Sequence, residues 1–216
     1  DVSRDGYYLQ KASVLFSEDA VRLTLLALEK EKSGQLIDFG CGAAHSLIGY
    51  CQRDNARTSL GIDINSDIAR AAKKSVEETG LRDRIVIVES DALSFGKWQS
   101  FVSKEQPQYF LASTMLHEFL RDGEEFVIDF LAKIRANFSD SQFFIIEFDA
   151  MPFEKIKTET DAERKLFAAM YELWHPLTNQ GMPQPQEVWE RIIKKSGWKI
   201  KNISRANMNL LIYHCE

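Results

Sequence analysis

The sequence contains little cysteine and no long apolar run. Its three cysteines, Cys41, Cys51 and Cys215, are too few and too scattered over 216 residues to form a disulfide framework. No apolar run approaches the roughly 18 residues that cross a bilayer, and no signal-like segment opens the chain. These absences argue against membrane insertion and secretion, and we expect a protein of the reducing cytoplasm.

The sequence also lacks an excess of positive charge. Its 27 Lys and Arg residues against 32 Asp and Glu residues give a formal net charge of -5. A surface that binds nucleic acid normally needs Lys and Arg to neutralise phosphates, so we expect a small-molecule substrate and no nucleic-acid partner. With 44% hydrophobic residues, the chain can bury one sizeable core, and a single globular domain is expected.

Strand-like and helix-like patterns alternate along most of the chain. Strands are predicted at residues 35–39, 59–64, 85–90, 108–113 and 142–149, and helices at 17–32, 45–54, 66–79, 123–137 and 185–196. This alternation predicts right-handed crossovers and a doubly wound, mostly parallel α/β sheet that helices cover on both faces. Residues 198–204 and 207–214 add a closing hairpin with one antiparallel strand, for seven strands in all.

A Gly-x-Gly turn follows the first predicted strand. Gly40 and Gly42 flank Cys41 and let the backbone turn tightly, so that a ligand can approach the main chain closely. A dinucleotide fingerprint has a third glycine three positions after the second, where this sequence has His45. Asp38 lies two residues before Gly40, and an acid there suits a cationic ligand better than a pyrophosphate.

This segment, residues 36–45, resembles the first motif of class I S-adenosylmethionine (SAM) methyltransferases. In that family the acid at the position of Asp38 usually neighbours the methionine end of the cofactor, while Ala44 replaces the usual third glycine. The resemblance implies a Rossmann-like fold, with SAM as cofactor and a closing C-terminal hairpin. We expect residues 1–34 to cover the cofactor site, residues 35–216 to form the methyltransferase domain, and residues 150–184 to form a substrate lid.

Further cofactor residues are expected where the strands end, since ligands of open parallel sheets bind beyond the carboxyl ends of the strands. Asp63 lies about 20 residues after the glycine loop, where it can accept both ribose hydroxyls or, alternatively, cap a helix. Asp91 can bind an exocyclic amine beside an adenine slot, although such an acid alone is more typical of a turn. The predicted cofactor contacts are Asp38, Gly40, Cys41, Gly42, Asp63, Ile64, Asp91, Ala92, Leu93 and Ser113.

The fourth strand ends in Ser-Thr-Met-Leu-His-Glu-Phe, residues 113–119, and we expect this segment to decide the reaction. It is not an Asp-Pro-Pro-Tyr type of segment, so the usual sequence signature of enzymes that methylate the amino group of a nucleic-acid base is absent from it. His117 can act as a general base that deprotonates a hydroxyl, with Glu118 as its neighbour. It can also bind a metal, or simply form a hydrogen bond at the junction of strand and helix.

A metal site is one hypothesis for the same region. Glu147 lies in the apolar fifth strand, where a buried acid needs a partner, and His175 lies in the aromatic-rich segment 151–183. With His117 these residues would form a two-histidine, one-carboxylate set for a divalent or iron ion that chelates a 2-oxo acid. Alternatively, His175 only forms hydrogen bonds within a helix, or Asp149 replaces Glu147.

The segments 116–119 and 173–178, with the acidic fifth strand, resemble metal-dependent 2-oxo acid C-methyltransferases of the phenylpyruvate and 2-ketoarginine types. In that family, histidines at positions matching His117 and His175 bind the metal. Members often carry an N-terminal dimerisation region, and this chain is too short to include one, so a homodimer would form through a region that is absent here. The main hypothesis is carbon methylation of a metal-chelated 2-oxo acid. The alternatives are a metal-independent O-methyltransferase with His117 as base, and a non-catalytic SAM-binding protein or subunit.

Overall fold

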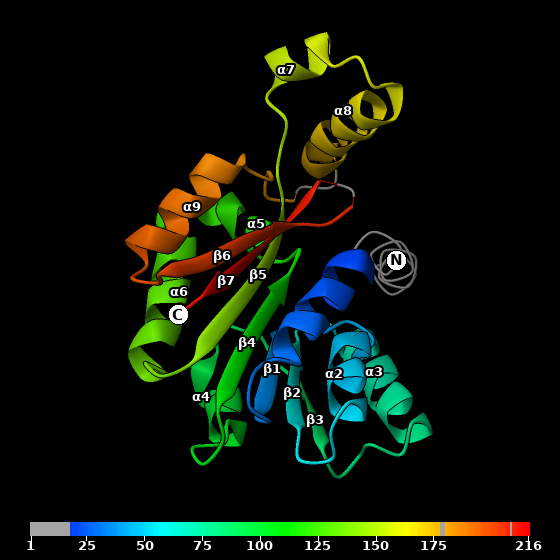
Figure 1. The fold of residues 1–216 in the computed structure, drawn as a ribbon, viewed down its shortest axis with the longest axis vertical. Helices are drawn as coiled ribbons and strands as arrows, with labels where there is room; N and C mark the ends of the chain where they lie inside the picture. The colour runs from blue at the N-terminus through cyan, green and yellow to red at the C-terminus, as the bar shows by residue number, and fades with distance from the viewer. Residues whose placement is uncertain (1–17, 178–179, 208) are drawn as a thin grey trace.

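The computed structural model describes residues 18–177, 180–207 and 209–216, and they form an α/β fold around one seven-stranded sheet (Figure 1). The strand order is β3-β2-β1-β4-β5-β7-β6. The strands are β1 (Gln35–Phe39), β2 (Thr58–Asp63), β3 (Ile85–Glu89), β4 (Gln108–Ser113), β5 (Gln142–Phe148), β6 (Ile200–Arg205) and β7 (Leu210–Cys215). Pairs among β1 to β5 are parallel, and β7 is antiparallel to both β5 and β6. The predicted sheet and closing hairpin are confirmed.

The helices connect the strands and cover the sheet. Residues 18–28 are helical, and the further helices are α2 (His45–Gln52), α3 (Ser66–Glu78), α4 (Phe95–Trp98), α5 (Leu116–Phe119), α6 (Glu124–Asn137), α7 (Phe153–Thr158), α8 (Ala162–Leu177) and α9 (Gln186–Lys195). Short 3-10 turns, η1 (Gln99–Phe101) and η2 (Leu120–Asp122), extend α4 and α5. No helix in the described ranges is long and apolar enough to span a bilayer.

The two faces of the sheet bury separate hydrophobic clusters because successive strand residues point to opposite sides. In β1, Ile37 and Phe39 contribute to the cluster under α4, α6 and α9. Leu36, which precedes Ile37 and so points to the opposite side, packs with α2, α3 and helix 18–28 on the other face. Figure 1 shows these two helical layers on either side of the strands. The sheet is therefore buried on both faces, as its long apolar strands require.

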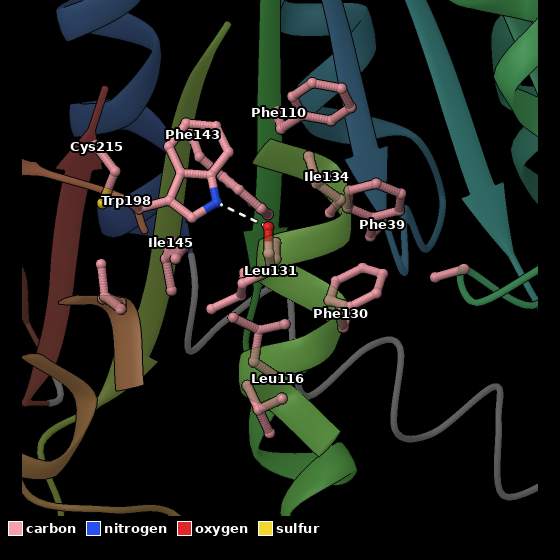
Figure 2. Close-up of a cluster of buried hydrophobic side chains, with 14 of the residues drawn as sticks. Phe39, Phe110, Leu116, Phe130, Leu131, Ile134, Phe143, Ile145, Trp198 and Cys215 are labelled. Carbon is pink, nitrogen blue, oxygen red and sulfur yellow. Dashed lines mark hydrogen bonds between the residues drawn. The ribbon is translucent and has the colours of Figure 1, made fainter. Parts of the chain in front are cut away.

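An aromatic cluster fills the face under α6 (Figure 2). The Trp198 indole N–H donates to the carbonyl of Leu131 in α6 at 3.0 Å, and its ring lies 5.5 Å from that of Phe143. Phe39 contacts Phe130 edge-on, with 5.3 Å between ring centroids. Such pairs add about 0.5–1.5 kcal/mol each beyond the area they bury, so this half of the core holds β1 and β5 rigidly in place.

Most core elements begin and end within about two residues of their predicted bounds, but the first helix ends at residue 28 and not 32, and β7 begins at Leu210 and not at 207. Residue 17, the predicted start of the first helix, lies outside the described residues, as does the stretch before it that was expected to cover the cofactor site. Helices α4, α5, α7 and α8 were not predicted as separate elements. Three of them have six residues or fewer, too short to show a helical period, and α8 lies within the segment expected to be a lid.

The parallel strands β1, β2, β4 and β5 all end at one edge of the sheet. Helices α7 and α8 lie beyond that edge, above the ends of β4 and β5 (Figure 1). The loops that leave these strands carry the residues singled out above, so the candidate site is built at the carboxyl edge of the sheet.

Candidate active site

The loop between β1 and α2 has the conformation that a close ligand requires. The backbone N–H groups of Gly40 and Cys41 donate to the carbonyl of Ile62, at 2.8 and 3.1 Å. Gly40 and Gly42 are left-handed, with φ of 67° and 54°, and Ala44 is left-handed as well, with φ of 65°. Ala44 thus keeps the geometry of the glycine it replaces, at a cost of about 1–2 kcal/mol in backbone strain.

Asp38 leads into this loop and is almost completely buried. Among the described residues, its Oδ1 atom has no hydrogen-bond donor, while Ser46 donates to the carboxyl group. Burial and, second to it, the charge of Asp63 raise the pKa of Asp38, the Ser46 hydroxyl opposes them, and together they place the pKa at about 8. A buried carboxyl group without a cation nearby is costly, so this one fits a positively charged ligand such as an ammonium group.

Asp63 is fixed to the same loop. Its carboxylate accepts the backbone N–H of Gly42 at 3.1 Å and that of Asn65 at 2.9 Å. Asn65 is the residue that caps α3, so helix capping does not explain Asp63. The carboxylate keeps further lone pairs for hydroxyl donors, as the ribose assignment needs.

The remaining predicted cofactor residues lie around this loop in different environments. Asp91 accepts the backbone N–H of Leu93 at 2.9 Å, which is the turn geometry expected of an isolated acid. Ala92 is buried, whereas Ile64 is 72% exposed and points outward. The Ser113 hydroxyl is buried and has no partner in the described part of the chain. Their contacts with a cofactor stay predictions.

The end of β4 lies against the glycine loop. Thr114 is left-handed, with φ of 50°, and its N–H donates to the Ile146 carbonyl at 2.7 Å. A Cβ atom on Gly40 would lie 3.2 Å from Cγ of Met115, so the two loops are in contact. Strain in a residue other than glycine often marks a functional site, and here it turns the chain from β4 into α5 and places His117.

His117 is paired with Glu147 inside the protein. Nδ1 of His117 and Oε2 of Glu147 are 2.8 Å apart, and the backbone N–H of His117 donates to Oε1 at 3.2 Å. His117 is 4% exposed and Glu147 is fully buried. With Nδ1–H of His117 donating a hydrogen bond to Oε2 of Glu147, the ring is held in place and Nε2 is left as the basic nitrogen.

The charges around His117 decide its protonation. Burial lowers the pKa of His117, but the charge of Glu147, its hydrogen bond and the nearby Glu118 outweigh burial, so the pKa lies above its usual value. Nε2 lies 3.6 Å from Oε1 of Glu118. A histidine held by a carboxylate in this way has the geometry that general-base catalysis requires.

Helix α8 brings a second histidine to this base. The rings of His117 and His175 are 5.1 Å apart and meet edge-on. His175 donates from Nδ1 to the Tyr171 carbonyl at 2.8 Å, and its ring packs on that of Tyr171 at 4.2 Å. Tyr171 in turn packs on Phe148, with 4.0 Å between ring centroids. Because burial lowers the pKa of His175, this histidine is mostly neutral near pH 7.

The segment after α8 also touches the base. A Cβ atom on Gly181 would lie 1.7 Å from the backbone oxygen of His117, so only glycine fits there. The Gly181 N–H donates to the Glu118 carboxylate, which opposes the increase in the pKa of Glu118 that burial causes. The loop that leaves the lid thus packs directly on α5.

The three side chains predicted to bind a metal do meet, but not as a set of ligands. Glu147 uses both oxygens on His117, and Nδ1 of His175 faces a backbone carbonyl. Within the ranges that the structure describes, no group of three or more His, Cys, Asp or Glu side chains is arranged to hold a metal ion. The residues present therefore do not fit the metal that the narrower resemblance implies.

Sequence reasoning missed Gly181 and Met115 as parts of this site, and it assigned Tyr171 to the lid without its contact to His175. Tyr171 lies four residues before His175, so helical spacing could have placed both on one face of α8. The contact of Gly181 with His117 and that of Met115 with Gly40 depend on tertiary packing, and no local pattern announces them.

Solved structures share this fold. An O-methyltransferase family protein from Burkholderia thailandensis is 17% identical, with a TM-score of 0.72 over 99% of this chain and 59% of its own. An O-methyltransferase family 2 protein from Planctomyces limnophilus, solved with apigenin, is 16% identical, with a TM-score of 0.71 over 100% of this chain and 62% of its own. PigF, solved with SAH, is 13% identical, with a TM-score of 0.73 over 99% of this chain and 59% of its own.

The chain spans about three fifths of the length of these structures. No family model matches the chain, and no curated protein matches its sequence. At this level of identity the likeness establishes the methyltransferase-type Rossmann-like fold, and the activity has to be argued from the site.

Proposed function

We propose that this chain is the catalytic region of a SAM-dependent methyltransferase that methylates a hydroxyl oxygen of a small molecule. The observation that carries the proposal is the buried His117–Glu147 pair, 2.8 Å apart, next to a loop with a buried, unsatisfied acid. Metal-bound carbon methylation of a 2-oxo acid receives no such support, because the required ligand set does not form.

The residues of the first loop fit SAM. Asp38 would pair with the ammonium group, and Asp63 would accept the ribose hydroxyls, since each has oxygen lone pairs directed away from its protein partners. When bound, SAM supplies an electrophilic methyl group on a positively charged sulfur. The contact between Met115 and the position of Gly40 keeps the acceptor side of the site beside the cofactor side.

The residues after β4 would activate the acceptor. Nε2 of His117 takes the hydroxyl proton, and the neighbouring Glu147 carboxylate stabilises the imidazolium that forms. Tyr171, which is partly exposed and packs on His175, offers aromatic surface near His117, which suits a planar acceptor. The Planctomyces protein was solved with apigenin, a phenolic compound, which supports testing phenols first.

A pair of measurements tests this function. We expect the protein to bind SAM and to transfer a labelled methyl group to at least one member of a panel of phenols. His117→Gln should lower kcat about 100-fold or more, because general-base catalysis contributes on that scale, while the affinity for SAM stays the same. Asp38→Asn should instead leave kcat the same and weaken SAM binding, which calorimetry measures.

Three results would count against the proposal. Unchanged methyl transfer by His117→Gln would show that His117 is not the base. Methyl transfer to the carbon of a 2-oxo acid, if chelators abolish it, would restore the metal hypothesis. SAM binding without transfer to any panel member would favour a non-catalytic binding protein.

A further inference from the structure

Helix α8 carries an acid on the face that packs on the molecule. Ala168, Tyr171 and His175 point inward from this helix. Glu172 lies on the same side, four residues after Ala168. It is half-buried, burial raises the pKa of its carboxyl group, and it has no ion-pair or hydrogen-bond partner among the described residues. An inward acid of this kind is costly unless a cation joins it.

Glu172 lines a small hollow with aromatic walls. The hollow lies between α8 and the end of β5, and its volume is about 270 Å³ with the open mouth included. Phe148, Phe167 and Tyr171 line it as well. The centroid of the Tyr171 ring is 4.0 Å from that of Phe148 and 5.6 Å from that of Phe167. Pockets for whole drug-sized ligands measure about 300–1,000 Å³, so this hollow suits one end of a molecule.

The walls of the hollow indicate the charge of that end. Faces of aromatic rings attract cations, and a partly desolvated carboxylate binds an ammonium group through a charge-assisted hydrogen bond. Asp149 also lines the hollow, but it already accepts a hydrogen bond from Arg205 at 2.8 Å. Glu172 is therefore the carboxylate that is left for a ligand.

The hollow lies close to the base of the proposed reaction. Tyr171, one of its walls, packs on the His175 ring at 4.2 Å, and the His175 ring lies 5.1 Å from that of His117. Burial raises the pKa of the Tyr171 hydroxyl, and the charges of the two carboxylates beside His117 raise it further, so this hydroxyl is within range of both. One molecule of modest size can thus reach from His117 to Glu172.

We propose that the hollow binds a cationic amine of the acceptor, so that the acceptor is a phenol with an ammonium group on a short alkyl chain. This inference rests on the proposed function and adds the class of substrate to it. The phenolic hydroxyl lies at Nε2 of His117, the ring along Tyr171, and the ammonium group beside Glu172. The hydroxyl oxygen bonds to the methyl group as the bond from methyl to sulfur breaks, and the hydroxyl proton passes to His117.

Calorimetry with matched phenols tests this subsite without turnover. The probes are para-hydroxyphenyl alkylamines of different chain length, such as tyramine, and the same compounds with a hydroxyl in place of the amine. Each is added to the protein saturated with SAH. At least one amine should bind about tenfold more tightly than its neutral counterpart. Glu172→Gln should remove this preference and leave the affinity for the neutral phenols the same, which also shows that the variant is folded.

Glu163→Gln is the matched control. Glu163 lies in the first turn of α8, nine residues before Glu172 and so on the opposite side of the helix, and it is exposed. This variant should keep the preference for the amines. The inference is overturned if amines and neutral phenols of every chain length bind alike, or if Glu172→Gln keeps the preference.

Methyl transfer to the same compounds separates this inference from the proposed function. If neutral phenols are methylated with the same kcat/KM as the amines, the function stands and the amine subsite is refuted. If the amines bind through Glu172 and no phenol is methylated, the subsite stands and the function is refuted.

Discussion

Two buried acids of this protein are in opposite electrostatic situations. Glu147 has two donors from His117, whereas Asp38 has one oxygen without any donor in the described residues. The first acid is satisfied within the chain and orients the His117 ring. The second is left for a ligand, and the protein without ligand bears the cost of that arrangement.

The cost at Asp38 should appear in the pH dependence of stability. Its pKa is raised from 3.8 to about 8. The contribution of protonated Asp38 to the free energy of unfolding is therefore fully present below pH 3.8 and is lost as the pH rises through 8. Asp38→Asn should therefore be more stable than the unmodified ligand-free protein at pH 8, by at least about 1 kcal/mol in the free energy of unfolding. Denaturant titrations of both proteins at pH 5 and pH 8 measure the difference.

The same change should weaken SAM binding, so stability and affinity should move in opposite directions. A variant that is no more stable at high pH than the unmodified protein would show that Asp38 already has a partner in solution.

The charge of Glu147 should set the pH at which the base works. Because the pKa of His117 lies above its usual value, kcat/KM should rise with pH as the imidazolium loses its proton. Glu147→Gln keeps an oxygen for Nδ1 and removes the negative charge, so the acidic limb of the pH profile should move to lower pH while kcat falls.

Glu124→Gln is a suitable control for this shift, since Glu124 forms an exposed ion pair with Arg191. An acidic limb that stays in place in Glu147→Gln would mean that the limb does not report the protonation of His117.

At the scale of elements, the site depends on a contact between two segments far apart in sequence. The loop after α8 packs on α5 so closely that Gly181 has no room for a side chain beside His117. The same residue donates to Glu118. Gly181 thus fixes the loop after α8 to α5, in addition to the contact between His175 and His117.

Gly181→Ala should separate the loop after α8 from α5. The added Cβ would meet the backbone oxygen of His117, so one segment has to move, and methyl transfer should fall about tenfold to 100-fold. SAM binding should be retained, because the glycine loop and Asp63 are not in contact with Gly181. Gly96→Ala, which meets nothing within 4 Å, should leave the rate unchanged. Equal rates in both variants would show that the contact does not position the base.

The sheet was predictable from the sequence because its strands are long, apolar and separated by turn residues. The glycine loop and His117 were identifiable for the same local reason, since both directly follow strands. The pairing of His117 with Glu147 follows the turn at Thr114, whose left-handed conformation no residue pattern indicates. Likewise, the sequence pointed to a lid but not to which face of α8 would be buried, because burial of a helix face is decided by its neighbours.

At the scale of the whole molecule, α7 and α8 stand apart from the two helical layers (Figure 1). Most of their side chains are exposed, and Ile156, Ala168 and His175 are the buried ones. Segments with few buried contacts open locally at low free energy. We therefore expect α7 and α8 to be the least stable helices in the described part of the chain.

Limited digestion with trypsin should show this directly. Among the described residues, the first cuts should fall at the exposed basic side chains Lys155, Lys157, Arg164 and Lys165. The cut protein should still bind SAM while methyl transfer is lost, because His175 is no longer held in place. First cuts within the sheet or its covering helices would contradict this order of stability.

The position of β7 has a consequence for how the molecule assembles. β7 follows β6 in the chain but lies between β5 and β6, antiparallel to both. During synthesis, the outer edge of β5, the strand that carries Glu147, therefore has no neighbour until β7 emerges from the ribosome. An unpaired edge of this kind attracts other chains, so the nascent protein should depend on chaperones most strongly in the interval between β5 and β7.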